Sequence, residues 1–378
     1  MGSMYKHFEA KDIKSARTRL NEAIPLTGSL TNGSVYGTDN IKTYAHGIFV
    51  SCYDYPYLSS SANQICDLSV GVGVNGDSYL SSSAWAAKKR NIYNMFSQVL
   101  VGHDADGDIL RFDQDGDLVN AGTKYDDVFI IPFSRLLYKD EIKKGSFSLT
   151  LGIEEDYDGL GGGEGEGTAG MCDETITIED EDAENDYRVN SPAGEYGILR
   201  VTDDTTAAPN DTETDADYDP RCGLIFYQAG IVVLSHDIFN AFDSVSNIHG
   251  KISSSGADCE MDSSGQTVTQ LLRNGSIEDA CDALRHRICR IDFNNTTELH
   301  STIYTLRVDG FNHSSNPTYL SGSQIRTKRS RYDQDTVYFT GGELVAADGA
   351  VLAKFSVSEP IKHQASTDSK VIRVRLDY

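Results

Sequence analysis

Hydrophobic and polar residues alternate along much of the chain with the two-residue period that is typical of β-strands. Residues 68–74 carry Leu or Val at every second position, with Ser or Gly between them, which predicts a strand buried on one face. Similar runs predict strands at residues 47–52, 128–133, 147–153, 197–202, 303–308, 337–340, 344–346, 351–357 and 372–378. An apolar stretch at residues 223–234, with a turn at Ala229-Gly230, predicts a hairpin.

Three segments have the spacing of amphipathic helices instead. Residues 9–22 predict a surface helix with Ile13, Ala16 and Leu20 on one face. The clearest helix follows Ser83, with an apolar stripe formed by Trp85, Ile92, Met95, Phe96, Val99 and Leu100. Its charged residues outside the stripe are Lys88, Lys89 and Arg90. A further helix is expected to begin at Ser276, with Asp279 completing a capping box and an apolar face formed by Ile277, Cys281, Leu284 and Ile288.

These elements predict a mainly β protein with a few helices (α+β), built on antiparallel sheets with a sandwich-like core. We expect an N-terminal helical arm at residues 4–30 and a β-rich body at residues 31–378, in one or two lobes. Acidic insertions are expected at residues 154–186 and 203–219. The first holds fourteen acidic and no basic residues, so most of it is expected on the surface, with residues 175–178 as its short strand.

The chain of 378 residues contains 33 Lys and Arg against 57 Asp and Glu, a formal net charge of −24. This acidity argues against nucleic acid and against a membrane surface as partners, because both attract clustered positive charge. The seven cysteines include no CxxC pair, so scattered reduced thiols are expected. No secretory signal and no bilayer-spanning apolar segment is recognised, which favours assembly in the cytoplasm.

Motifs of enzyme chemistry are missing or lie in the wrong context. Residues 165–170 match G-x-G-x-x-G, but they lie in the first acidic insertion with no helix pattern after them, so a flexible linker is predicted. Ser235, His236 and Asp237 are adjacent in sequence, whereas the members of a catalytic triad come from separate segments. There is no G-x-S-x-G, Walker A or helical zinc motif. We therefore expect no enzymatic activity and no cofactor.

Closely spaced aspartates suggest a cation site between residues 104 and 117, namely Asp104, Asp106, Asp108, Asp113, Asp115 and Asp117. An EF-hand needs Gly at position 6 and Glu at position 12 of its loop. Counting from Asp104 places Ile109 at position 6, and counting from Asp113 places Lys124 at position 12. Asp-Gly turns explain these aspartates best, and a cation site of another kind stays the alternative.

Two groups of side chains are candidates for subunit contacts. Tyr53, Tyr55 and Tyr57 offer large contact areas, although they would equally suit the edge of the protein's own core. The second group is the basic cluster of Arg326, Lys328, Arg329 and Arg331. Another basic cluster, at residues 285–290, is expected to be solvated, with contact to an acidic surface of another subunit as the alternative.

Several blocks of sequence resemble the virion structural proteins of large contractile-tailed bacteriophages, especially marine ones. They lie at residues 53–63, 133–145, 187–197, 223–230, 293–299, 316–322 and 373–378, and skip both acidic insertions. The resemblance implies a non-enzymatic particle component without an active site, surrounded by copies of itself and other virion proteins. A place in the tail, neck or baseplate is the first expectation. The alternatives are a capsid-surface component and a carbohydrate-directed tail protein that binds or depolymerises glycans.

Overall fold

The computed structural model describes residues 8–25, 40–119, 121–152, 175–180, 183–203, 221–239, 261, 264–308, 336–364 and 370–378. The protein is mainly β, with a large antiparallel sheet and few helices, as the sequence predicts. The chain forms two compact units. The larger unit consists of Asn21–Thr297, and the smaller unit combines Met1–Leu20 with Glu298–Tyr378.

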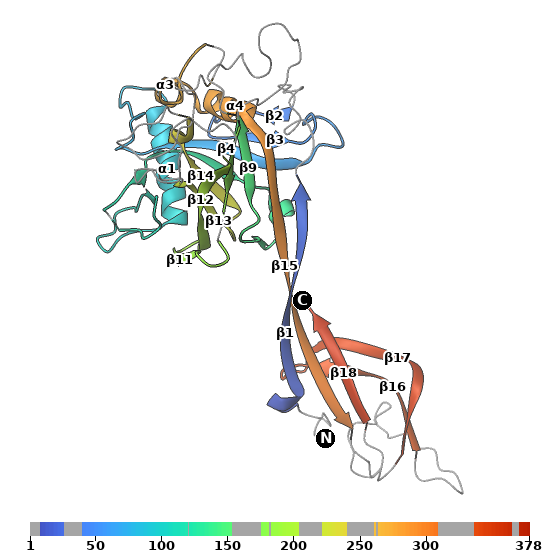
Figure 1. Ribbon diagram of the computed structural model, residues 1–378. Coiled ribbons are helices and arrows are strands. Elements are labelled where there is room, and N and C mark those ends of the chain that lie inside the picture. Colours follow the sequence, from blue (N-terminus) through green and yellow to red (C-terminus); the bar gives the residue numbers. More distant parts are fainter. Residues whose placement is uncertain are drawn as a thin grey trace. The chain divides into compact units, whose positions relative to one another are not determined.

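The large sheet is assembled from strands that are distant in sequence (Figure 1). Its spatial order is β1 (Ile13–Pro25), β15 (Ile288–Val308), β9 (Ser148–Gly152), β10 (Thr175–Glu179), β12 (Gly194–Asp203), β13 (Arg221–Phe226), β14 (Ile231–Ser235), β7 (Asp127–Pro132), β4 (Gln64–Val72), β3 (Val50–Tyr53) and β2 (Ile41–Lys42). Off this path lie β11 (Arg188–Ser191), which pairs with β12, and β8 (Glu141–Ile142) and β18 (Lys370–Asp377), which pair with β15. The predicted hairpin is confirmed as β13 and β14.

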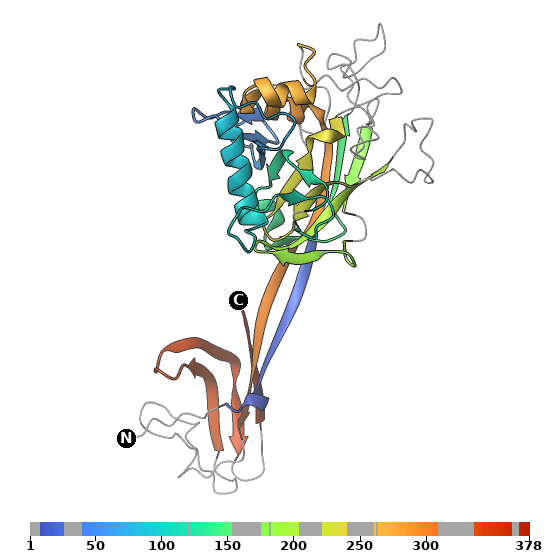
Figure 2. The ribbon, with the colours of Figure 1, turned by 90° about the vertical axis from the view of Figure 1, so that its left-hand side faces the viewer.

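Helices cover the β4 region of the sheet in the larger unit (Figures 1 and 2). Both α1 (Ala86–Leu100) and α4 (Ile277–Arg287) pack against β4, and α3 (Val268–Asn274) packs against α4. A short α2 (Arg135–Tyr138) follows β7. The predicted capping box of α4 is confirmed, because the Ser276 and Asp279 side chains each accept the other's backbone N–H at 3.0 Å.

The half-buried strand predicted at residues 68–74 is buried on both faces in β4. The second face, which carries Ser69 and Gly71, is covered by α1. A Cβ on Gly71 would lie 3.0 Å from the Cα of Tyr93, so the missing side chain lets the helix backbone approach the sheet. Small residues on the alternate face therefore indicate a close helix contact, whereas the sequence analysis assigned them to solvent.

Helix α1 begins and ends close to its predicted limits, but its predicted faces are partly wrong. Met95 and Val99, expected in the core, are 51% and 60% exposed. Lys89, expected outside, is 1% exposed, and its Nζ donates to the carbonyls of Leu272 at 2.5 Å and Gly275 at 2.8 Å. The ammonium thus satisfies carbonyl groups at the C-terminus of α3, which explains why a charge lies among apolar neighbours.

The helical N-terminal arm predicted at residues 4–30 is wrong. After a short 3-10 turn, η1 (Ala10–Asp12), residues 13–25 form strand β1, which lies next to β15 in the sheet. The local spacing of Ile13, Ala16 and Leu20 suits a helix, but pairing with a distant strand outweighs that local preference. The arm is also not a separate domain, since residues up to Leu20 belong to the smaller unit.

The acidic segments are described only in part. Residues 153–174 and 204–220 lie outside the described residues, which leaves the expected surface position of those insertions untested. The predicted strand at residues 175–178 is confirmed as β10, between β9 and β12. Asp180, the residue after β10, is 1% exposed and does not belong to a solvated loop. The segment up to Asp180 is therefore part of the core architecture, contrary to expectation for that carboxylate, whereas Glu184 and Asp186 are exposed as expected.

Cysteine chemistry differs from the expected uniform set of reduced thiols. Cys52, Cys66, Cys222 and Cys281 are buried free thiols. Cys289, by contrast, is disulfide-bonded, so the prediction is wrong at this position. A disulfide at Cys289 is not predictable from the chain, because no CxxC or regular cysteine spacing is present.

The smaller unit contains the end of the chain. Strands β16 (Thr336–Val345) and β17 (Val351–Gln364) form a hairpin whose turn includes Gly349 at φ 89°. The predicted C-terminal strand is confirmed as β18, which pairs with residues 301–308 of β15. None of the apolar side chains described in this unit is buried, whereas the described core apolar residues all lie in the larger unit.

Candidate functional site

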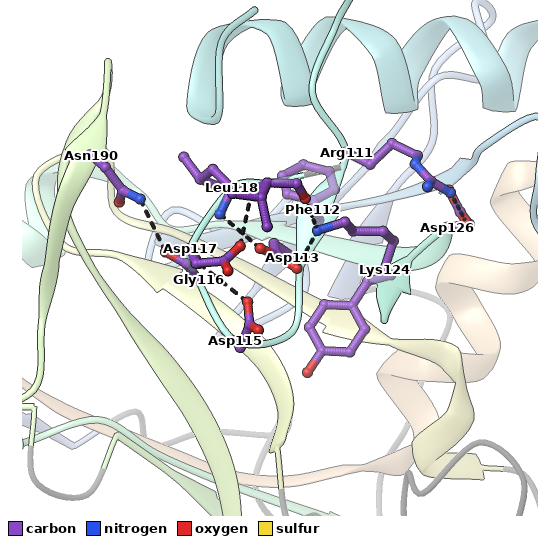
Figure 3. Close-up of polar contacts among 12 residues, drawn as sticks. Arg111, Phe112, Asp113, Asp115, Gly116, Asp117, Leu118, Lys124, Asp126 and Asn190 are labelled. Carbon is purple, nitrogen blue, oxygen red and sulfur yellow. Dashed lines mark hydrogen bonds and ion pairs between the residues drawn. The ribbon is translucent and has the colours of Figure 1, made fainter. Parts of the chain in front are cut away.

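The only group of potential metal-ligating side chains found among the described residues lies in the loop of a small ribbon. The ribbon pairs β5 (Phe112–Asp113) with β6 (Lys124–Tyr125). Carboxylate oxygens of Asp113, Asp115 and Asp117 lie within 4.8 Å of one another, and Figure 3 shows them gathered around the turn at Gly116. Three of the six predicted aspartates are therefore brought together.

Asp113 is the buried member of this carboxylate cluster, with 0% of its side chain exposed. Its Oδ1 accepts from Lys124 Nζ at 2.6 Å, and its Oδ2 accepts from the backbone N–H of Leu118 at 2.8 Å (Figure 3). Burial raises the pKa of Asp113 to about 6, and the bonds from Lys124 and Leu118 oppose that rise. The same ammonium donates to the carbonyl of Val119 at 2.5 Å.

The other two carboxylates of the cluster hold the turn through backbone amides. Asp115 Oδ1 accepts the N–H of Asp117 at 3.2 Å, and Asp117 Oδ1 accepts the N–H of Val119 at 2.8 Å. These are Asx turns, the local bonds for which aspartate is favoured in loops. They support the interpretation that turn chemistry selects these residues.

Polar side chains outside the loop, the exposed Asn190 and the buried Tyr196, fix its position. The carbonyl oxygen of Gly116 accepts from Asn190 Nδ2 at 3.0 Å and from the Tyr196 hydroxyl at 2.9 Å. Gly116 and Leu118 have positive φ angles of 72° and 61°. For Leu118 this conformation is unfavourable, and its N–H bond to Asp113 helps to hold it. The loop is thus tied to β12 and its neighbour β11.

Chemically, the cluster offers hard oxygen donors, which are the ligands that calcium prefers. Lys124 already provides a positive charge beside Asp113, so an added cation would have to compete with the ammonium. The remaining predicted aspartates form a separate turn, in which Asp104 Oδ1 accepts the N–H groups of Asp106 at 3.0 Å and Asp108 at 2.9 Å. The six aspartates therefore do not surround one site.

A second polar group surrounds His236, and it adds Asp127 to the Ser235, His236 and Asp237 run that the sequence shows. Its Nε2 lies 3.7 Å from Asp127 Oδ2, and its Nδ1 lies 3.5 Å from Asp237 Oδ1. Burial raises the pKa of Asp127, and the nearby His236 opposes that rise. Ser235 Oγ donates to Asp237 Oδ2 at 2.8 Å. This arrangement does not aim the serine at the imidazole as a nucleophile and base require.

The predicted contact tyrosines follow β3 on the surface of the larger unit. Tyr53 ends β3 and lies with its ring centroid 6.3 Å from that of Tyr57. Tyr55 and Tyr57 are 52% and 37% exposed, and the neighbouring Leu58 is 84% exposed. These exposures place Tyr55 and Tyr57 outside the core and leave them accessible to another molecule.

The structure describes only one of the two basic clusters. Arg326, Lys328, Arg329 and Arg331 lie outside the described residues. In the other cluster, Arg285 and Arg287 are 1% and 0% exposed, so the predicted solvated surface is wrong there. Arg285 forms two hydrogen bonds with Asp282 Oδ1, from Nε at 3.0 Å and from a terminal nitrogen at 2.9 Å. Arg285 and Arg287 therefore form part of the packing of α4, whereas the Arg290 side chain is 71% exposed and pairs with Asp292.

Comparison with protein-family models, with curated proteins and with solved structures finds no match for this chain. Among the described residues, no helix has the length and apolarity needed to cross a membrane. The functional proposal therefore rests on the sequence resemblance described above and on the geometry of the chain.

Proposed function

We propose that this protein is a non-enzymatic structural component of a bacteriophage virion, most simply in the tail, neck or baseplate, and that it acts through subunit contacts. The sequence blocks described above support the virion assignment. The architecture supports action through subunit contacts. The larger unit has a complete apolar core, whereas the described residues of the smaller unit include no buried apolar side chain.

The observation that carries the proposal is the exposure of apolar side chains in the smaller unit. Its described residues include six large exposed apolar side chains, namely Ile13, Leu20, Val351, Leu352, Val371 and Tyr378. A β-sheet needs a covered apolar face to be stable. Exposed apolar surface on such a sheet is typical of proteins that fold into an assembly.

The polar groups of the larger unit also favour a structural role. The Asp113 carboxylate and the Lys124 ammonium are bonded to each other and to backbone groups, and Ser235 donates to a carboxylate. These contacts hold loops in place, and they do not join a nucleophile to a base. The carboxylate cluster is therefore proposed to stabilise its loop.

The test is to count copies of this chain in purified phage particles that carry its gene, using quantitative mass spectrometry. The proposal predicts several copies per particle and density for the chain in a map of the tail, neck or baseplate. Its presence in infected cells but not in particles would contradict the proposal. Turnover of a host-type polysaccharide by the purified protein would favour the carbohydrate-directed alternative instead.

A further inference from the structure

Two of the buried free thiols lie directly opposite each other on neighbouring strands. In the register of β3 and β4, Cys52 pairs with Cys66, and both residues are 0% exposed. Opposite residues of an antiparallel pair have Cα atoms about 4.5–5.5 Å apart and share one face of the sheet. A disulfide needs Cα atoms about 4.4–6.8 Å apart, so this position already has the backbone spacing of a disulfide.

The two thiols are also in contact, and the backbone beside them is irregular. A hydrogen bond with the Cys52 thiol is the main cause that raises the pKa of Cys66 well above its ordinary value, and burial is the second cause. The register of the two strands shifts between Cys52 and Tyr53. Such a bulge increases local twist and bending, which lets the strands adjust to a bond between the sulfur atoms.

The other buried free thiols lack this arrangement. Cys281 belongs to α4, which packs against β4, and burial followed by the neighbouring Cys52 thiol raises its pKa. No strand register places Cys281 opposite either cysteine of the pair. Cys222 lies on β13, which β14, β7 and β4 separate from β3. Among the described cysteines, Cys52 and Cys66 are therefore the pair that the sheet holds in register.

The chain tolerates oxidised cysteine, because Cys289 is disulfide-bonded. Disulfides form and persist where the surroundings are oxidising, so the pair on β3 and β4 meets the same oxidants. The outer neighbour of β3 in the sheet is β2, which has two residues. Elements with few neighbours open locally more readily than the core of a sheet. Such opening admits a small oxidant to thiols that the closed sheet shields.

We propose that Cys52 and Cys66 are a redox site that forms a reversible disulfide between β3 and β4 on reaction with a small-molecule disulfide. One cysteine thiolate attacks a sulfur of the small disulfide, which forms a mixed disulfide and releases one small thiolate. The second cysteine thiolate attacks the mixed disulfide, which joins the two cysteines and releases the second small thiolate. The two cysteine protons go to the released thiolates. Two cysteines are thus oxidised, and the small disulfide is reduced to two thiols.

The bond closes the base of an exposed loop. Residues 54–63 connect β3 to β4 and carry Tyr55, Tyr57 and Leu58, which are 52%, 37% and 84% exposed. A covalent link between the two strands removes conformational freedom from the unfolded chain and keeps the strands from separating. The oxidised pair therefore holds this tyrosine surface more firmly than the reduced pair.

The experiment treats the folded full chain with oxidised glutathione, unfolds it, blocks the remaining thiols with iodoacetamide and maps the disulfides by peptide mass spectrometry. The inference predicts a bond between Cys52 and Cys66, whereas Cys222 stays a thiol and is alkylated. An excess of reduced glutathione should restore both thiols of the pair. The melting temperature should rise by at least about 3 °C when the bond forms.

Two variants separate this bond from other effects of the oxidant. Cys66→Ala should lose both the bond and the rise in melting temperature, whereas Cys281→Ala should keep both. Circular dichroism before treatment verifies that each variant is folded. If Cys66→Ala does not fold, the peptide map of the original chain decides the question by itself.

Three results would overturn the inference. The first is alkylation of both Cys52 and Cys66 after treatment of the folded chain. The second is a bond from either of them to Cys281, and the third is a bond between them that forms only in urea. A bond between Cys52 and Cys66 that leaves the melting temperature unchanged would contradict the restraint of the loop.

Discussion

Asp180 and Lys89 are buried charges whose partners are mainly backbone groups of distant segments. Asp180 accepts the N–H groups of Gly145 at 2.7 Å and Phe147 at 2.9 Å, and the Tyr227 hydroxyl at 3.1 Å. Burial raises the pKa of Asp180 to about 6, and these hydrogen bonds oppose that rise. A buried charge with such a set of partners fixes the position of a loop.

Asp180→Ala should lower the free energy of unfolding by about 3 kcal/mol at neutral pH, because two buried N–H groups and a hydroxyl lose their acceptor. Urea unfolding followed by circular dichroism measures the loss. The control Glu184→Ala removes a carboxylate whose side chain is 67% exposed, and it should change stability by less than about 0.5 kcal/mol. Equal effects for the two variants would show that the Asp180 bonds contribute little.

Lys89 makes stability depend on pH in the alkaline range. Burial lowers its pKa to about 8, below the ordinary 10.5. Between these values the unfolded chain binds a proton that the folded chain lacks, so the free energy of unfolding rises with pH. Relative to Lys89→Met, the original chain should gain about 1.5 kcal/mol between pH 8 and pH 9.5. A stability difference that stays constant with pH would contradict this assignment.

The Asp113 and Lys124 pair is the buried ion pair of the carboxylate cluster. Lys124→Met should destabilise the protein by about 3–5 kcal/mol, because it leaves the Asp113 carboxylate buried without its counter-charge. Adding Asp113→Asn to Lys124→Met should restore part of that loss, since the buried negative charge is then removed. Thermal melts of the two variants test this, and a double variant less stable than the single one would contradict it.

At the scale of single residues, the sequence analysis predicted side-chain chemistry better than side-chain position. The turn-forming role of Asp113, Asp115 and Asp117 followed from their type and spacing. The burial of Lys89 and Arg285 could not be predicted from type and spacing, because charged residues on a helix are normally solvated. The partners of Lys89 lie at the end of another helix, and Arg285 is bonded to Asp282 of its own helix but is covered by packing that a local pattern does not reveal.

At the scale of elements, the contact between α1 and β4 depends on a single glycine. Gly71 leaves space for the backbone of Tyr93, and an added Cβ would lie 3.0 Å from its Cα. Elements with strong local signals, such as the capped helix α4, were predicted with nearly correct limits. Strand β1 was not, because its structure comes from pairing with β15, far away in the sequence.

Gly71→Ala should lower the free energy of unfolding by about 1–3 kcal/mol, because the new methyl group presses against α1. Gly71→Val should cost more, since its branches need further displacement of the helix. The control Val74→Ala changes a side chain that is 56% exposed just beyond β4 and should have little effect. Urea unfolding ranks the three variants by their free energy of unfolding. A Gly71→Val variant as stable as the Val74→Ala control would contradict the close contact between β4 and α1.

At the scale of the whole molecule, the sequence predicted the fold class but not the division into units. The smaller unit joins residues from the two ends of the chain, a grouping that no linker indicates. The formal charge of −24 likewise conceals a difference, because nearly all the acidity belongs to the larger unit.

Hydrogen–deuterium exchange at several protein concentrations shows whether the smaller unit depends on subunit contacts, because it reports the protection of each strand separately. We predict that amides of β4, β7 and β14 stay protected at every concentration, since the larger unit has its own core. Amides of β16, β17 and β18 should be protected at high concentration and lose protection on dilution as the copies separate. Protection of β16–β18 that is independent of concentration in a monomeric chain would contradict the claim.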